Sequence, residues 1–290
     1  MSDGAMIRYV YVDGHLLPAD GRHLSALDRG FTLSDGVFET MRVAGGRAFR
    51  LWEHLTRLRA SADVLRLPVP WPDEELAEAI ARLLAANDLQ EAVARLTVSR
   101  GVPAERGLLP PSPCAPTLVA QVSPFHRLPD EKLAGGLGVH TSSIRRNETS
   151  PTCRIKVCSY LDNVLARMEA REAGADEALL LNTAGFLACC SSANLHVISG
   201  GRVLTPSVEC GALPGITRGV VQELAAGIGL VWEEAWLRPA DLAAAEEALL
   251  TNSVLGVVAI TRVDGRLVGL GTPGRATLRL AREYEDLLRP

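Results

Sequence analysis

Lysine is almost absent from this sequence of 290 residues. Lys132 and Lys156 are the only lysines among the 30 basic residues, and the others are arginine. An arginine guanidinium keeps its proton and cannot attack a carbonyl group, so side-chain amine chemistry falls to one of the two lysines. Lys132 lies in the polar stretch LPDEKLAGG and is expected to be a solvated surface charge.

Cysteine pairs, long apolar runs and an excess of positive charge are also missing. The six cysteines show no CxxC spacing, and we expect them to be reduced thiols. No stretch approaches the roughly 18 apolar residues of a membrane-spanning helix, and the N-terminus lacks the features of a secretion signal. The formal net charge of −4 is spread along the chain without a basic stripe. We therefore expect a soluble, cytoplasmic protein with no membrane or nucleic-acid partner.

Histidine and serine do not form recognisable catalytic or metal-binding groups. The six histidines lack the spacing of metal ligands, so no metal site is expected, and His54 is interpreted as structural. Ser191 and Ser192 have no evident His and Asp partners for a catalytic triad, and we assign them to a cofactor loop.

Hydrophobic periodicity divides the chain into two parts. Residues 1–123 alternate strand-like runs with two amphipathic helices, which predicts a small α+β domain. The polar, proline-punctuated residues 124–132 are predicted to be a linker, and residues 133–290 a larger α/β domain. Helices are expected over residues 51–65, 73–87, 157–173 and 215–229, with a final helix that ends in REYEDLL.

Lys156 lies in RIKVCSYLDN, among apolar and hydroxyl residues and just before a predicted helix. Partial desolvation there lowers the pKa of an amine and frees it to form a Schiff base. The alternative is a lysine whose charged end reaches solvent at the start of the helix. The predicted helix carries an apolar stripe of Val157, Leu161, Val164, Leu165 and Met168.

The segment LPGITRG begins another amphipathic helix with Gly215, Ile216 and Thr217. Free amides and the helix dipole make such a start a ready phosphate site, although most Pro-Gly helix starts bind nothing. The TNS triplet that ends in Ser253 either contacts the same phosphate or simply makes a turn. A reactive lysine, a phosphate-binding helix start and a second hydroxyl-rich loop together describe a site for pyridoxal 5′-phosphate.

Seven segments resemble, in this order, the class IV (fold-type IV) aminotransferase-type proteins. This group includes branched-chain and D-amino acid aminotransferases and, closest in appearance, 4-amino-4-deoxychorismate lyase. The segments are DRGFTLSDGVFE, HLTRL, RIKVCSYLDNVLA, AGADEALLLNTAGFL, SSANL, LPGITR and LLTNS. The resemblance covers nearly the whole chain and implies a two-domain α/β (α+β) enzyme, a homodimer with pyridoxal 5′-phosphate in the cleft between its domains.

The resemblance also implies roles for individual residues. Lys156 is the Schiff-base lysine and moves the proton. Tyr160 is placed near the phenolic oxygen of the cofactor, although its spacing from the lysine varies within the family. The phosphate is bound by Arg57, Ile216, Thr217 and Ser253.

The sequence departs from the family pattern at Cys189. Five residues before Asn194 the family usually has a glutamate that protonates the pyridine nitrogen, and this chain reads GFLACCSSAN. A thiol is at best a weak hydrogen-bond partner, so the bound ring is a weaker electron sink. We expect Cys189 to favour elimination over transamination; a water or a neighbouring group in place of the acid is the alternative.

The segment SRGVPAERGL resembles the arginine-bearing loop of aminodeoxychorismate lyases. Arg100 and Arg106 are candidates for a carboxylate clamp, since guanidinium suits bidentate capture, and surface arginines are the alternative. Leu108 stands where an aromatic residue is common in that group. Phe31 of the DRGF segment is assigned to substrate binding.

The lead prediction is 4-amino-4-deoxychorismate lyase, which forms 4-aminobenzoate and pyruvate by β-elimination in folate biosynthesis. The alternative is an aminotransferase that acts on D-amino acids, branched-chain amino acids or (R)-amines. A third possibility is a non-catalytic protein that binds the cofactor. The sequence does not determine the substrate, the dimer geometry or the subunit that supplies the RGVPAERGL loop.

Overall fold

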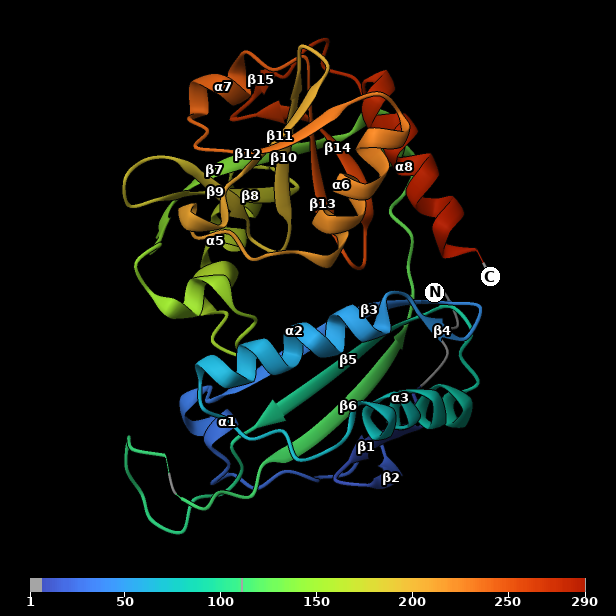
Figure 1. Cartoon of the computed structure of the whole chain (residues 1–290), viewed down its shortest axis with the longest axis vertical. Coiled ribbons are helices and arrows are strands. Elements are labelled where there is room, and N and C mark those ends of the chain that lie inside the picture. Colours follow the sequence, from blue (N-terminus) through green and yellow to red (C-terminus); the bar gives the residue numbers. More distant parts are fainter. Residues whose placement is uncertain (1–6, 111, 290) are drawn as a thin grey trace. The chain divides into compact units, whose positions relative to one another are not determined.

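The computed structural model describes residues 7–110 and 112–289 and divides into two compact units. The first unit consists of the chain up to His126 together with Ile155–Ser159. The second consists of Arg127–Arg154 and Tyr160–Arg289. Each unit is built on one β-sheet and the helices that pack against it (Figure 1).

The first unit contains a six-stranded antiparallel sheet in the order β2-β1-β6-β5-β3-β4. Helices α2 (Leu51–Val64) and α3 (Asp73–Asn87) cover one face of this sheet, and the short α1 (Arg29–Leu33) precedes β3 (Figure 1). The strands are β1 (Tyr9–Val12), β2 (His15–Pro18), β3 (Gly36–Ala44), β4 (Arg47–Ala48), β5 (Ala92–Ser99) and β6 (Thr117–Pro124).

Side-chain alternation along β3 decides which residues meet these helices. Val37 and Met41 are fully buried and belong to the same core as Leu58 of α2. Glu39 lies between them in the alternation, so its carboxylate points to the helix-covered face, where it is 0% exposed. Phe38 points to the opposite face. The core of the first unit therefore contains a buried charge that needs a partner.

The second unit contains a nine-stranded mixed sheet, with parallel pairing at β7/β8, β7/β14 and β11/β12. The strand order is β12-β11-β10-β13-β14-β7-β8-β9, and β15 pairs with β14. The strands are β7 (Leu137–Arg146), β8 (Glu177–Asn182), β9 (Leu187–Cys190), β10 (Asn194–Ser199), β11 (Arg202–Pro206), β12 (Val231–Ala235), β13 (Glu247–Asn252), β14 (Gly256–Val263) and β15 (Arg266–Leu267).

Helices of the second unit pack on this sheet, with α5 against β7 and β8 and with α6 and α8 against β13 and each other (Figure 1). These helices are α4 (Asp130–Gly135), α5 (Leu161–Glu172), α6 (Ile216–Gly227), α7 (Pro239–Ala243) and α8 (Arg275–Leu288). Two 3₁₀ turns span Pro151–Arg154 and Val208–Cys210.

The predicted helix that follows Lys156 needs correction. It begins at Leu161, four residues later than the start predicted at Val157, because Val157 forms an antiparallel bridge with Val37 of β3. The apolar stripe from Leu161 to Met168 does not face the sheet, because small and polar residues of the helix pack there instead. Residues Asn163, Ala166 and Ala170 are buried, whereas the exposed fractions are 67% for Leu161, 50% for Val164, 43% for Leu165 and 52% for Met168.

The unit boundaries differ from the predicted domains 1–123, 124–132 and 133–290 at the linker and at the Lys156 segment. The first unit extends to His126, and the predicted linker contains the start of α4 at Asp130. Residues Ile155–Ser159, predicted within the larger domain, belong to the first unit. The reason is their backbone pairing with the edge of β3.

Candidate active site

Lys156 lies in an extended segment that pairs with β3. The amide of Phe38 donates a hydrogen bond to the carbonyl oxygen of Lys156 at 3.0 Å, and the amide of Cys158 donates to that of Gly36 at 2.9 Å. The amide of Lys156 donates to the hydroxyl of Ser61 in α2 at 3.2 Å. Lys156 is therefore fixed against both the sheet and α2 of the first unit.

The amine of Lys156 has the properties of a nucleophile. Its side chain is half-buried, and Nζ lies 4.2 Å from the centre of the Phe38 ring. Burial lowers the pKa of Lys156 to about 8; Glu39 opposes this shift, and Arg57 and Arg95 add to it. At pH 7 such a lysine has roughly 300 times more neutral amine than one with the ordinary pKa.

Glu39 is held by two side chains from α2. Its Oε1 accepts a hydrogen bond from Nε of Arg57, and its Oε2 accepts from Nη2 of Arg57 and from Nδ1 of His54, each at 2.7 Å. Burial alone raises the pKa of a carboxyl group, but Arg57 and His54 outweigh it and lower the pKa of Glu39 to about 2. The buried carboxylate therefore stays ionised at neutral pH.

Arg95 of β5 approaches the same aromatic ring as Lys156. Its guanidinium carbon lies 3.6 Å from the centre of the Phe38 ring, and its Nε donates to Oγ1 of Thr97 at 3.3 Å. Arg95 and Lys156 thus place two positive charges around Phe38, on a strand surface that α2 and α3 do not cover.

Sequence reasoning missed Glu39, Phe38 and Arg95 as site residues. A signal existed for Glu39, because an acidic residue occupies an inward position of the strand-like run GVFETMRV. Arg95 gave no comparable signal in a chain so rich in arginine. His54 was interpreted as structural, and it lies buried with its ring bound to Glu39.

The predicted phosphate-binding helix start is α6 of the second unit. No side chain caps its amino end at Gly215, so the amides of its first turn have no acceptor from a capping residue. A Cβ at Gly215 would lie only 2.0 Å from Oδ1 of Asn194, so this close approach requires glycine. Thr217 is buried and Ile216 is half-buried. This start is suited to an anion.

The TNS turn lies at the strand end next to α6. Thr251 of β13 stands opposite Asn194 of β10, and Nδ2 of Asn194 donates to the carbonyl oxygen of Leu213 at 2.8 Å. The Asn252 side-chain oxygen accepts hydrogen bonds from the backbone amides of Val254 and Leu255, and these bonds shape the loop that carries Ser253. The structure therefore brings the LPGIT segment and Ser253 to the same end of two adjacent strands.

Cys189 lies in β9, opposite Leu180 of β8. Burial raises the pKa of its thiol, which is 6% exposed and therefore neutral at neutral pH. Glu177 of β8 contributes negative charge nearby, but its carboxylate accepts a hydrogen bond from the Ser191 hydroxyl and pairs with Arg167 at 2.6 Å. Glu177 is thus engaged with the SSAN turn.

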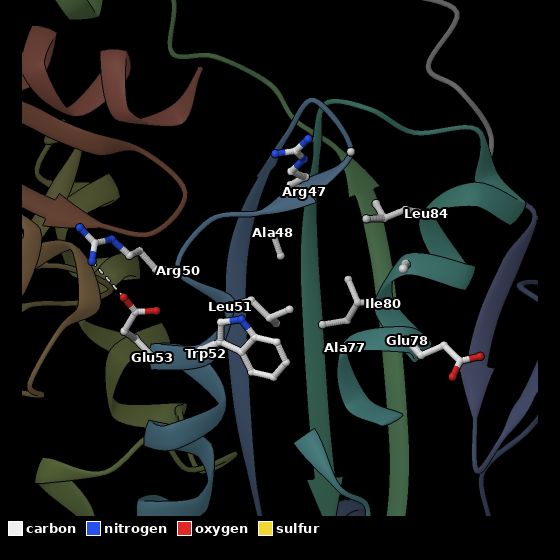
Figure 2. A pocket seen from close by; sticks show the side chains of 12 residues that line it. Arg47, Ala48, Arg50, Leu51, Trp52, Glu53, Ala77, Glu78, Ile80 and Leu84 are labelled. Atoms are coloured by element: carbon white, nitrogen blue, oxygen red, sulfur yellow. Dashed lines mark hydrogen bonds and ion pairs between the residues drawn. The ribbon is translucent and has the colours of Figure 1, made fainter. Parts of the chain in front are cut away.

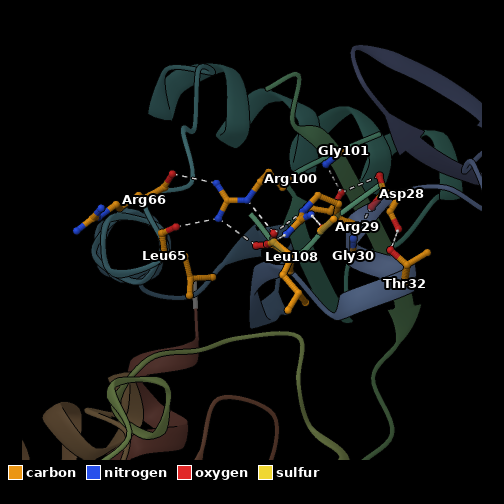
Figure 3. Close-up of polar contacts among 12 residues, drawn as sticks. Asp28, Arg29, Gly30, Thr32, Leu65, Arg66, Arg100, Gly101 and Leu108 are labelled. Atoms are coloured by element: carbon orange, nitrogen blue, oxygen red, sulfur yellow. Dashed lines mark hydrogen bonds and ion pairs between the residues drawn. The ribbon is translucent and has the colours of Figure 1, made fainter. Parts of the chain in front are cut away.

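Arg100 has a different setting from that of a substrate clamp (Figure 3). It is 4% exposed, and its Nε and Nη2 donate to Asp35 at 2.8 and 3.0 Å. It also donates to the carbonyl oxygens of Leu65 and Arg66 at the end of α2. These contacts make Arg100 a buried structural arginine, which argues against its predicted role in substrate binding.

The loop after Arg100 is anchored by Arg29, which shares the carboxylate of Asp35 at 2.8 Å. Arg29 donates to the carbonyl oxygens of Gly107 and Leu108 at 2.7 and 2.9 Å. Asp35 therefore ties the loop to the end of α2 through two arginines. The two remaining substrate candidates, Arg106 and Phe31, are exposed, and their roles stay predictions.

Tyr160 occupies the position before the first residue of α5 and is half-buried. Its contact with the cofactor stays a prediction. The six cysteines are free thiols, and Lys132 forms an ion pair with Asp176 at 2.6 Å.

A hollow of 530 Å³ lies between β4, α2 and α3 (Figure 2). Leu51, Ile80 and Trp52 line it with apolar surface, and Arg50 and Glu53 form an ion pair at 2.9 Å among the lining residues. Its size suits a small molecule, but Lys156 is not among its lining residues.

Two kinds of feature are absent from the described part of the chain. Residues 7–110 and 112–289 contain no group of three His, Cys, Asp or Glu side chains arranged to hold a metal ion. Within the same residues, every helix is too short or too polar to span a bilayer.

These residues fit pyridoxal 5′-phosphate at two points. The lowered pKa of Lys156 suits reaction with the aldehyde, and the uncapped start of α6 suits the phosphate. The arrangement is less complete at Cys189, where a neutral thiol stands in place of an acid.

Comparisons with known proteins agree with this chemistry. The amino-transferase class IV family matches residues 36–263. The chain is 34% identical over 281 residues to a provisionally assigned branched-chain-amino-acid aminotransferase of Methanocaldococcus jannaschii, covering 96% of each chain. It is 31% identical to a D-alanine aminotransferase of Listeria monocytogenes, covering 97% of this chain and 96% of the relative.

Solved structures share the fold. The branched-chain amino acid aminotransferase of T.th., solved with pyridoxamine 5′-phosphate, superposes with a TM-score of 0.92 at 29% identity, covering 98% of this chain and 94% of the other. A provisionally assigned 4-amino-4-deoxychorismate lyase of Legionella pneumophila gives a TM-score of 0.83, covering 93% and 97% of the two chains, but at 24% identity it supports the fold alone. The predicted fold class and cofactor are confirmed: the protein is a pyridoxal 5′-phosphate-dependent enzyme with a mixed α/β fold. The chain belongs to the class IV aminotransferase family.

Proposed function

We propose that the protein is an aminotransferase that acts on small aliphatic α-amino acids. One observation carries the proposal: the Lys156 amine and the Arg95 guanidinium both lie against the ring of Phe38. The pKa of this amine is about 8. A guanidinium binds a carboxylate well, and an amine of this kind can take a proton from the adjacent α-carbon. The relatives that match almost the whole chain are named for aminotransfer from branched-chain amino acids or D-alanine.

Each residue has a separate task in this proposal. Pyridoxal phosphate, when bound, supplies an electron-withdrawing ring that stabilises negative charge at the α-carbon. Lys156 holds and moves the α-proton, and Arg95 orients the substrate carboxylate. The phosphate is held by Arg57, Ile216, Thr217 and Ser253.

A panel of donors tests the proposal. The purified holoenzyme is incubated with L-leucine, L-valine, D-alanine or an (R)-amine and with 2-oxoglutarate, and glutamate formation is measured. We expect turnover with at least one aliphatic α-amino acid, and the preferred enantiomer decides between the two groups of relatives. Absence of aminotransfer from every donor, in a protein that binds the cofactor, would contradict the proposal.

Two arginine variants then identify the carboxylate partner. Arg95→Leu should raise KM for the amino acid about 10-fold or more, because a charge-assisted hydrogen bond contributes roughly 1.5–3 kcal/mol. Arg106→Leu tests the exposed loop arginine as the competing candidate. A large KM effect in Arg106→Leu alone would move the carboxylate site to the loop.

The lyase stays the second candidate, and Cys189 is the observation that favours it. A neutral buried thiol protonates a pyridine nitrogen poorly, which weakens the electron sink that transamination needs more than elimination does. Formation of 4-aminobenzoate from 4-amino-4-deoxychorismate, compared in native protein and Cys189→Glu, tests this candidate. Fast transamination by the native enzyme without lyase activity would exclude it.

A homodimer is proposed for the assembly, and the exposed face of α5 supports it. Four apolar side chains of α5 are 43–67% exposed on one side of the helix, and a patch of this kind favours burial against another surface. Met168→Glu should shift the elution mass from dimer to monomer, whereas Met168→Leu, which keeps an apolar side chain at this position, should not. An unchanged dimer in Met168→Glu would place the interface elsewhere.

We also propose a cytoplasmic location. The six cysteines are free thiols, and several of them are buried, which suits a reducing compartment. Fractionation of the cells that express the protein tests this.

A further inference from the structure

We propose that Glu39, held by His54, is a positioning residue that orients Arg57 and provides the counter-charge of Lys156. This inference rests on the proposed roles of Arg57 at the phosphate and of Lys156 in proton transfer. It goes further because it assigns a role to two buried residues that stand behind them.

The contact between Glu39 and Arg57 fixes the direction of the guanidinium. Glu39 engages Nε and Nη2, each at 2.7 Å, so the carboxylate and the guanidinium lie edge to edge. A planar guanidinium held along one edge cannot rotate about its last bonds without losing one of the two hydrogen bonds. The edge formed by the two Nη groups therefore has a set direction, which is what recognition of a second anion requires.

His54 keeps the carboxylate in that orientation. Burial lowers the pKa of His54, so its ring is neutral at neutral pH, while Glu39 is ionised and can only accept hydrogen bonds. The proton between them therefore belongs to Nδ1 of His54, which donates to Oε2 at 2.7 Å. Both side chains are buried, His54 at 1% and Glu39 at 0% exposure, so water does not compete for this bond.

Lys156 lies beside Glu39 along the chain of contacts to β3, because its carbonyl oxygen accepts a hydrogen bond from the amide of Phe38, the residue before Glu39. The charges around Lys156 are unequal. The groups that act on it from the neighbouring elements are Glu39 on β3, Arg57 on α2 and Arg95 on β5. Lys156 in turn acts on His54 of α2. Glu39 is the carboxylate that opposes the two arginines at Lys156, so its removal should leave the amine facing uncompensated positive charge.

The two lysines of this chain make a direct test. In competitive acylation of the cofactor-free protein across a pH series, the labelled peptides of Lys156 and Lys132 are quantified by mass spectrometry. Lys132, which pairs with Asp176, serves as the control within the same molecule. Glu39→Gln should lower the apparent pKa of Lys156 by about one unit, because the loss of an adjacent opposite charge disfavours the protonated amine. The labelling of Lys132 should be the same in the variant and the native protein. An unchanged Lys156 pKa in the folded variant overturns the inference.

Substitutions of His54 test the positioning of Arg57 and keep the test open if Glu39→Gln does not fold. Asparagine can place an amide N–H near the position of Nδ1, whereas leucine cannot donate. We expect His54→Leu to weaken pyridoxal phosphate binding about 10-fold, in line with the loss of one hydrogen bond to a charged group, and His54→Asn to retain affinity within about 3-fold. Equal affinity in both variants and the native protein overturns the inference.

The same experiments separate this inference from the proposed function. The acylation pKa is measured without substrate or cofactor, so it reports on Glu39 and Lys156 even if no amino acid is a donor. Failed aminotransfer with the expected pKa shift would contradict the function alone. Aminotransfer without the shift would contradict the role of Glu39 alone.

Discussion

The depressed pKa of Lys156 predicts that the cofactor-free protein becomes more stable at alkaline pH. A protonated lysine that is partly desolvated costs free energy in the folded state, and this cost is present in full at pH values below the folded pKa of about 8. Between about 8 and the ordinary value of 10.5, the folded protein loses the proton before the unfolded chain does. The unfolded chain then binds more protons, so stability rises with pH in this window.

The magnitude follows from the two pKa values. Linkage between pH 7 and pH 10 gives roughly 2.5 kcal/mol for pKa values of about 8 and 10.5, and partial exposure of the side chain reduces this to about 2 kcal/mol. Lys156→Met removes the titrating group and keeps most of the apolar stem. The native protein should therefore gain about 2 kcal/mol in free energy of unfolding relative to Lys156→Met over this pH range.

Urea unfolding followed by circular dichroism, with both proteins free of cofactor, measures this difference. At pH 7 Lys156→Met should be the more stable protein, and at pH 10 the gap should have largely closed. A gap that stays constant from pH 7 to pH 10 would refute the reasoning, because it would mean that Lys156 titrates alike in the folded and unfolded chains.

Two further predictions concern the buried charges of the first unit. The pKa of Glu39 is about 2 in the folded protein instead of 4.5, so Glu39 contributes stability above pH 4.5 that is lost as the pH falls towards 2. Between pH 4.5 and pH 2 the free energy of unfolding of the native protein should therefore fall by roughly 3 kcal/mol more than that of Glu39→Gln. Asp35→Asn should cost about 3 kcal/mol in urea unfolding, because Arg29 and Arg100 lose their shared charged partner. It should also speed tryptic cleavage after Arg106, and unchanged cleavage would show that Asp35 does not anchor the loop.

The elements with strong local signals were predictable from sequence. Apolar periodicity and flanking prolines were enough to place α3 at residues 73–87 and α2 within one residue of its end. The apolar run EALLLN has the pattern of a buried strand, and all six residues of β8 are buried. Lys156 could be singled out because arginine, which fills nearly every other basic position, cannot do amine chemistry.

The misplaced elements were those whose environment comes from distant residues. Val157 has the apolar character of a helix stripe, but pairing with Val37 makes it part of a strand contact. The apolar side chains of α5 are exposed, although an apolar face usually meets a core, because Ala166 and Ala170 pack against the sheet instead. Arg100 and Arg95 look alike in the sequence, and their different partners separate them.

The sequence by itself determined that one lysine, a glycine-led helix start and a hydroxyl-rich turn supply the chemistry of a pyridoxal phosphate enzyme. Residue type and spacing are local properties, and they suffice to identify an amine and a phosphate cradle. Only the tertiary structure showed that Lys156 contacts β3 and α2, that Glu39 binds both Arg57 and His54, and that Arg100 is buried against Asp35. Those relations join residues as distant in the sequence as Phe38 and Lys156. Ionisation depends on burial and neighbouring charge, which exist only once the chain is folded.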